Sequence, residues 1–122
     1  MIKLENSVTL YVPKESNEGH ILNFDSELNF LTGLFGGSTT ISAEGKWVDV
    51  HQNSYIDRLD LVQFNYGEVT PYIVTALMNT IVTIISKGEQ LAVSVTINGQ
   101  LYIFEKTDGA RFIEKTLGGA ML

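Results

Sequence analysis

The chain has 122 residues, of which 44% are hydrophobic and 18% charged, and it contains no cysteine. One domain of this size can bury a substantial core, and the lack of cysteine excludes disulfides, thiolate nucleophiles and zinc–thiolate sites. A formal net charge of −6 argues against non-specific nucleic-acid binding, because that activity requires Lys and Arg side chains that neutralise phosphates.

The first third of the chain predicts a strand followed by a helix. Residues 7–13 alternate apolar and polar side chains up to Pro13, which is typical of a strand with one buried face. From Ile21 onward the apolar residues recur every three or four positions, so we expect a helix. The helix is expected to end at Gly36 and Gly37, because glycine easily adopts the left-handed conformation that closes a helix.

Two further strands are expected in the middle of the chain. Residues 38–43 and 46–50 have the composition of one β-rich segment, and we predict a β-bulge between them at Glu44 and Gly45. A polar turn follows. The third predicted strand, residues 55–67, places alternate apolar side chains on one face.

The second half of the chain begins with a helix signal. Thr70 supplies a capping side chain, Pro71 suits the first helical position, and the apolar stripe that follows predicts a long helix. Residues 91–106 then form two alternating segments around Asn98 and Gly99, the dipeptide typical of a type I′ hairpin.

The order of these elements predicts an α+β fold. The first six follow the βαββαβ order of the ferredoxin-like split βαβ sandwich, in which two helices cover one face of an antiparallel sheet. The C-terminal β-hairpin adds an extra strand. We expect a single domain over residues 1–106, and a tail over residues 107–122 that is either a short helix packed on the body or a mobile arm.

No catalytic constellation stands out in the sequence. The glycines of the segment 36–45 follow a helix, and Lys46 is succeeded by Trp47, so the pattern of a phosphate-binding loop is absent. A metal site or general base at either histidine would need a second ligand or an orienting carboxylate beside it. His20 lies in or near a polar loop, and Asp49 lies two residues before His51, a spacing in a turn that is common by chance. The sequence therefore predicts no catalytic residue, no metal site and no cofactor, and a protein that is not an enzyme.

Three segments carry a resemblance to a known group: VTLYVPKE at 8–15, LFGGST at 34–39 and AEGKWVD at 43–49. They are similar to the pattern L-Y-V-P, F-G-G-[AS]-T and A-x-G-x-W of a group of small uncharacterised proteins from bacterial plasmids and phages. The resemblance covers roughly residues 8–66 and carries no activity that can be assigned to individual residues. It implies a mobile-element accessory protein, a class in which inhibitors of host defence are frequent.

Charge and this context together favour a non-enzymatic protein-interaction module. Residues 15–60 contain eight acidic and two basic side chains, which suits a basic protein partner such as a nucleic-acid-handling effector. The leading hypothesis is an anti-CRISPR-like inhibitor of a bacterial defence system that binds and occludes its partner. The residues expected to bind the partner are Glu44, Trp47, Asp49, Asp57 and Asp60.

The alternative hypothesis is a small-ligand or nucleotide-binding domain. Its pocket would lie near the turn at residues 36–40, and the expected ligand-binding residues are Gly36, Gly37, Thr39, Lys46 and Trp47. A sheet with one uncovered face also offers a surface for a homodimer, as does the tail.

Nothing in the sequence predicts a membrane protein. The N-terminus lacks a basic region followed by an apolar block, and the most apolar window, residues 72–85, is too short to span a bilayer. We expect a soluble, cytoplasmic protein.

Overall fold

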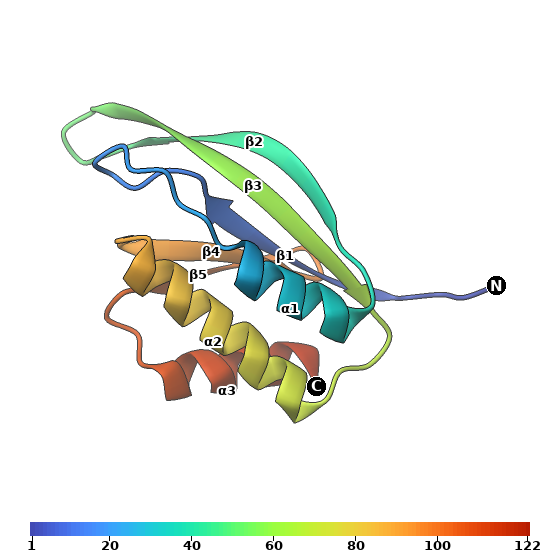
Figure 1. The fold of residues 1–122 in the computed structure, drawn as a ribbon. Helices are drawn as coiled ribbons and strands as arrows, with labels where there is room; N and C mark the ends of the chain where they lie inside the picture. The colour runs from blue at the N-terminus through green and yellow to red at the C-terminus, as the bar shows by residue number, and fades with distance from the viewer.

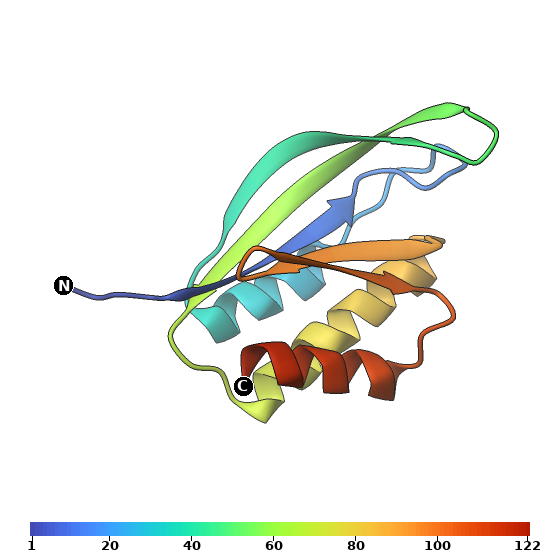
Figure 2. The same ribbon diagram turned by 180° about the vertical axis from the view of Figure 1, so that it is seen from behind.

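One antiparallel sheet with helices on a single face forms the fold in the computed structural model, which describes all 122 residues (Figures 1 and 2). The strands lie in the order β2-β3-β1-β4-β5. In chain order they are β1 (Asn6–Pro13), β2 (Thr39–Val48), β3 (Ser54–Tyr66), β4 (Ala92–Ile97) and β5 (Gln100–Glu105). The helices are α1 (Asp25–Phe35), α2 (Pro71–Lys87) and α3 (Ala110–Met121).

The predicted ferredoxin-like α+β fold is confirmed. β1 lies at the centre of the sheet and pairs antiparallel with β3 on one side and with β4 on the other. This is the arrangement that two right-handed crossovers impose on the βαββαβ order. The β4–β5 hairpin turns at Asn98 and Gly99, which both have positive φ (49° and 80°), as a type I′ turn requires.

Local signals fix the ends of the two crossover helices. α1 ends where Gly36 adopts φ 90° and donates its backbone N–H to the carbonyl of Thr32 at 2.9 Å. α2 begins after Thr70, whose hydroxyl accepts the N–H of Ile73 at 3.3 Å, with Pro71 at the first helical position. Both helix ends therefore follow from the residues that the sequence places there.

The hydrophobic core lies between the sheet and the helices. Alternate residues of β1 and β3 point into it, and Phe64 of β3 is fully buried with its ring 4.8 Å from that of Phe35 of α1. Leu77 and Ile81 of α2 are fully buried on the opposite side of the core. Burial of one such side chain stabilises the fold by about 1.5–3 kcal/mol. No helix in the structure is long and apolar enough to cross a membrane.

The C-terminal residues form a third helix on the same face of the sheet. α3 buries Ile113, Leu117 and Met121, which belong to the same core cluster as the residues of α2. Figures 1 and 2 show α3 beside α2, with the C-terminus close to the start of α2. Residues 110–121 of the expected tail thus complete the helical layer.

The expected β-bulge at Glu44 and Gly45 is absent. β2 is continuous over ten residues, and Glu44 and Gly45 pair in an unbroken register with Arg58 and Asp57 of β3. The side chain of Leu59 instead packs closely against Gly45, because a Cβ at this position would lie 3.2 Å from Cδ1 of Leu59. A glycine within a strand is compatible with either a bulge or such an approach, and the sequence alone did not separate them.

Candidate functional site

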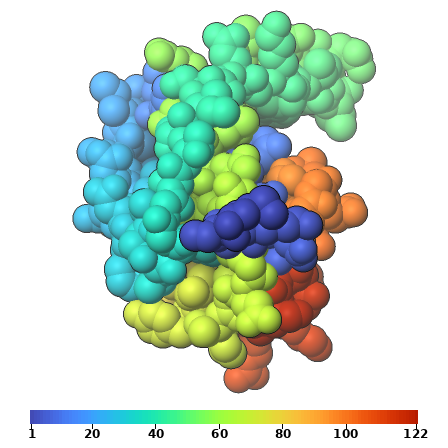
Figure 3. Space-filling view, turned by 90° about the vertical axis from the view of Figure 1, so that its right-hand side faces the viewer, coloured from blue at the N-terminus to red at the C-terminus, as the bar shows by residue number.

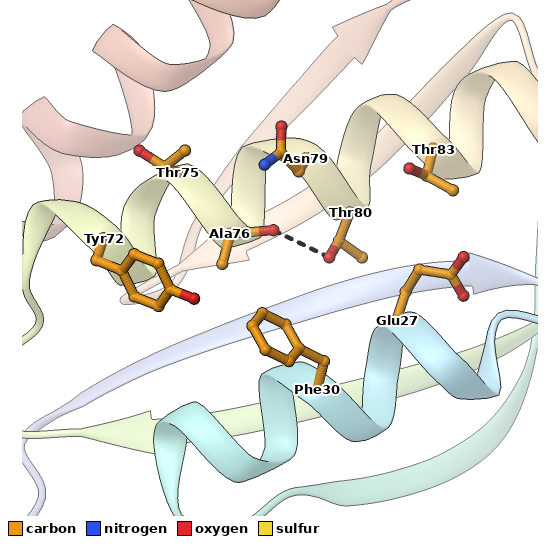
Figure 4. A pocket seen from close by; sticks show the side chains of 8 residues that line it. All are labelled: Glu27, Phe30, Tyr72, Thr75, Ala76, Asn79, Thr80 and Thr83. Atoms are coloured by element: carbon orange, nitrogen blue, oxygen red, sulfur yellow. Dashed lines mark hydrogen bonds between the residues drawn. The ribbon is translucent and has the colours of Figure 1, made fainter.

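An open groove of about 200 Å³ lies between α1 and α2 (Figure 4). Residues spaced three or four apart line it from each helix, because such residues share one helix face. The lining consists of Glu27 and Phe30 from α1, and of Tyr72, Thr75, Ala76, Asn79, Thr80 and Thr83 from α2. A different stripe of α2, which includes Leu77 and Ile81, is buried in the core and fixes the helix on the sheet.

Two exposed aromatic rings stand at one end of the groove. Phe30 is 53% exposed and Tyr72 is 62% exposed, and Figure 4 shows their side chains extending from opposite helices. Flat aromatic faces of this kind stack on planar ligand groups and attract cations. The groove therefore offers an aromatic wall on each side.

The groove lining contains one charged side chain, that of Glu27. It lies in the first turn of α1, where the helix dipole stabilises negative charge. Its Oε1 is 3.3 Å from Nζ of Lys87, a side chain that is 68% exposed, whereas the side chain of Glu27 is only 22% exposed. The carboxylate is thus largely shielded by the protein, while its counter-ion is an exposed surface lysine.

Some polar groups of the groove are used by the fold and others are free. The hydroxyl of Thr80 donates to the carbonyl of Ala76 at 3.0 Å, and the hydroxyl of Thr75 donates to Glu114 of α3. The side-chain amide of Asn79 and the hydroxyl of Tyr72 make no hydrogen bond within the chain, so they can bond to a ligand. The combination of aromatic faces, one carboxylate and a free amide suits a cationic or nucleoside-like ligand.

The residues predicted to bind a partner lie on the β2–β3 hairpin, but on two different faces. Trp47 and Asp57 share the face turned away from the helices, and Nε1–H of Trp47 donates to Oδ2 of Asp57 at 2.9 Å. Glu44 and Asp60 lie on the other face, where Asp60 pairs with Lys14 at 3.1 Å. The structure therefore brings together only Trp47 and Asp57 of this set.

Asp49, also in that set, closes the turn after β2. Its carboxylate accepts the backbone N–H groups of His51 and Asn53 at 2.8 and 2.9 Å, and the hydroxyl of Tyr55 at 3.0 Å. These hydrogen bonds, led by that from the backbone of Asn53, lower the pKa of Asp49 below its ordinary value. The arrangement accounts for Asp49 as a turn residue.

The residues predicted to bind a small ligand are also divided. A second cavity, of about 320 Å³, is lined by Gly36, Gly37 and Thr39 together with Phe35, Gln63 and others. Lys46 and Trp47 do not line it. Trp47 lies eight residues beyond Thr39 along an extended strand, a span of about 26 Å at 3.3 Å per residue.

The groove residues do not belong to the buried apolar stripe by which each helix is predicted from the sequence. Phe30 lies outside the apolar spacing of α1, and Tyr72 lies outside that of α2. An aromatic residue displaced from the buried stripe of a predicted helix was the available signal. That both displaced residues meet across one groove depends on how α1 and α2 pack.

Solved structures with the same fold include those of a phage enzyme. A phage SAM lyase in complex with S-methyl-5′-thioadenosine matches with a TM-score of 0.61 and 10% identity, over 86% of this chain and 95% of that chain. A phage SAM lyase in its apo state matches with a TM-score of 0.58 and 8% identity, over 89% of this chain and 98% of that chain. No protein-family model and no curated protein match the sequence.

This likeness corrects two expectations. The prediction of a non-enzymatic, anti-CRISPR-like inhibitor is wrong, and so is the prediction that the protein is not an enzyme, because the structural neighbours with this fold are a ligand-binding enzyme. The acidic segment had suggested a basic partner. In the structure several of its carboxylates are engaged within the chain: Glu15 with Arg58, Glu27 with Lys87, and Asp60 with Lys14.

Proposed function

We propose that this chain is an enzyme of the SAM-lyase kind, which binds a sulfonium nucleoside in the groove between α1 and α2. The observation that carries the proposal is this groove, with two exposed aromatic rings and one carboxylate, on a fold shared with a phage SAM lyase. The thioadenosine bound to that neighbour is the portion of S-adenosylmethionine that such a groove suits.

Each part of the groove has a role toward such a substrate. The faces of Phe30 and Tyr72 stack on the adenine ring or face the sulfonium. Asn79 offers an amide that donates and accepts hydrogen bonds at the same time, as the edge of adenine requires. Glu27 attracts the positive charge of the substrate and exchanges Lys87 for it.

The one hydroxyl of the groove that lies beside a carboxylate is that of Thr75, which donates to Glu114 of α3. The proposed reaction does not use this hydroxyl, because the substrate carries a carboxylate of its own that can act as the nucleophile. In the proposed step, the carboxylate of the methionine portion attacks the carbon that carries the sulfur. A carbon–oxygen bond forms and the carbon–sulfur bond breaks, with its electron pair remaining on sulfur. Methylthioadenosine leaves, the amino-acid portion closes to a lactone, and no proton, water or redox partner is consumed.

The sulfur loses its positive charge as the carbon–sulfur bond breaks. This loss decides which groove residues contribute to substrate affinity and which to the rate of the chemical step. Glu27 interacts most strongly with the charged substrate and less with the transition state. It therefore contributes to substrate affinity more than to the rate of the chemical step. The protein contribution to rate is the holding of carboxylate and sulfonium in one reactive geometry.

The experiment that tests the function is incubation of the purified protein with S-adenosylmethionine, followed by chromatography of the nucleoside products. We expect methylthioadenosine to accumulate, and the amino-acid fragment to leave first as the lactone. Phe30→Ala should reduce turnover, whereas Phe112→Ala, which removes an equally exposed phenylalanine from α3, should not (exposures of 53% and 57%). If the wild type neither forms methylthioadenosine nor binds it in calorimetry, the proposal is wrong.

The wider context of the proposal agrees with the sequence. The phage origin of the structural neighbours fits the mobile-element setting implied by the L-Y-V-P and F-G-G-S-T segments.

A further inference from the structure

The outer edge of β2 is a long strand edge with no partner. β2 pairs with β3 through all ten of its residues, and it has no strand on its other side. No backbone hydrogen bond from a turn or loop reaches residues 39–48 either. Natural proteins usually shorten, bulge or cover such an edge, because its free N–H and C=O groups readily pair with another strand.

The same strand extends into a bare two-stranded ribbon. The pairing of β3 with β1 ends at Leu59 and Pro13, whereas its pairing with β2 continues to Ser54 and Val48. Figures 1 and 2 show this end of the β2–β3 hairpin reaching beyond the helical layer. A ribbon of two strands has little stability of its own in water.

Both faces of the ribbon expose large apolar side chains. Trp47 and Tyr55 are 49% and 40% exposed on one face, and Val48 and Ile56 are 58% and 63% exposed on the other. Figure 3 shows that the residues around position 50 stand apart from the body of the molecule. Exposed apolar side chains next to an open strand edge are typical of an interaction surface.

We propose that two copies of this chain pair antiparallel through β2, with the two-fold axis at Gly45. In this register Glu44 of each copy lies opposite Lys46 of the other, on the same face of the joined sheet. Ala43 lies opposite Trp47 of the second copy, so that a small side chain meets the indole ring. The sequence E-G-K is thus self-complementary in charge about its glycine.

The charge distribution favours a second copy of this chain as the partner that pairs with the free edge of β2. The protein carries a net charge of −6, so two copies repel each other over the acidic parts of their surfaces. β2, by contrast, contains one acid and one base, Glu44 and Lys46, and is neutral overall. It is therefore a place where two copies can meet without repulsion, and its two charges attract each other across the axis.

The test is a charge swap, followed by sedimentation velocity or light scattering over a range of protein concentrations. Glu44→Lys places lysine opposite Lys46 of the second copy, and Lys46→Glu places two glutamates together. Each single variant should weaken the dimer at least about tenfold. The combined variant restores opposite charges across the axis and should return the dissociation constant to near the wild-type value.

Controls separate pairing from folding and from overall charge. Glu68→Lys makes the same change of net charge as Glu44→Lys, but in a loop away from β2, and should leave the dimer intact. The melting temperature of every variant reports whether it folds. Amide hydrogen exchange of the wild type adds a measurement that needs no variant, because pairing predicts slower exchange at residues 39–48 as protein concentration rises.

A wild type that is monomeric at all concentrations would overturn the proposal. So would an assembly whose dissociation constant in both single charge variants equals that of the wild type, or one in which residues 39–48 exchange equally fast at low and high concentration. None of these results bears on cleavage of a sulfonium nucleoside, since the groove between α1 and α2 lies on different elements from β2.

Discussion

The indole nitrogen of Trp47 donates a hydrogen bond to the carboxylate of Asp57, 2.9 Å away on the neighbouring strand of the β2–β3 ribbon. The indole ring also stacks on Tyr55, with ring centroids 4.2 Å apart and an interplanar angle of 16°. The only tryptophan of the chain thus connects both strands of the ribbon where no third strand supports them. It serves as a built-in reporter of the ribbon.

The first prediction concerns this contact. Asp57→Ala removes the acceptor and should lower the free energy of unfolding by about 0.5–1 kcal/mol, with a change in the emission spectrum of Trp47. Urea unfolding followed by fluorescence measures both quantities. Glu105→Ala, at the other edge of the same sheet face, is the matched control and should change neither. Equal spectra for Asp57→Ala and the wild type would contradict the hydrogen bond.

The second prediction concerns Glu27 and Lys87 in the proposed enzyme. Glu27→Gln removes the charge that attracts a sulfonium and should raise KM about tenfold, with kcat little changed. Lys87→Met frees the carboxylate from its counter-ion and should lower KM. Steady-state kinetics of methylthioadenosine release gives both values. A loss of kcat with unchanged KM in Glu27→Gln would contradict the assigned role.

Removal of this ion pair should have little effect on stability. Lys87 is largely exposed, and ion pairs of this kind contribute about 0–1 kcal/mol. Thermal melts of the same two variants therefore provide the control that kinetic changes do not arise from unfolding.

The third prediction concerns acid pH. The hydrogen bonds to Asp49 hold its pKa below the ordinary value of 3.8, so its carboxylate stabilises the folded state above that pH. The contribution is lost as the pH falls below 3.8 through the folded-state pKa, since the proton that binds removes the charge-assisted bonds. Asp49→Asn should therefore show a smaller loss of stability between pH 5 and pH 3 than the wild type, by urea unfolding at each pH. If the free energy of unfolding falls equally with pH in Asp49→Asn and in the wild type, the prediction is contradicted.

The fourth prediction concerns a buried hydroxyl. Tyr66 is 4% exposed, its Oη has no hydrogen-bond partner, and burial raises its pKa above 10.0. Tyr66→Phe removes a desolvated polar atom and should increase the free energy of unfolding by about 1 kcal/mol at neutral pH. A decrease in stability would show that the hydroxyl is satisfied in solution.

The same variant has a consequence at alkaline pH. Because the folded state resists ionisation of Tyr66, the wild type loses stability as the pH rises above 10.0, where the unfolded chain releases the proton. Tyr66→Phe should lack this portion of the alkaline decline. Unfolding midpoints at pH 9 and pH 11 provide the comparison.

The fold was predictable from the sequence because its signals are local and agree with one another. The cap at Thr70, the helix stop at Gly36 and the turn at Asn98 each act through neighbouring residues. Together they leave one order of elements, for which few topologies exist. The bulge expected at Gly45 was wrong because the reason for that glycine is Leu59, on another strand.

The candidate site was not predictable in this way. Glu27 and Asn79 lie fifty-two positions apart and meet only through the packing of α1 beside α2. Neither residue belongs to a spaced motif, and both resemble ordinary solvated positions of a helix. The acidic segment suggested a basic partner for a related reason, since the sequence does not reveal which carboxylates pair with a cation within the chain.

The central position of β1 determines when the protein can fold during its synthesis. β1 is translated before both of its partners, and it pairs Asn6 with Tyr66 on one side and Val8 with Ile97 on the other. The half of the sheet with β3 cannot close until Tyr66 has been translated, and the half with β4 cannot close until Ile97 has been translated. Contacts so distant in sequence slow folding. The apolar strand β1 therefore remains without one or both of its partner strands until Ile97 has been translated. During this time its exposed apolar side chains are available for chaperone binding.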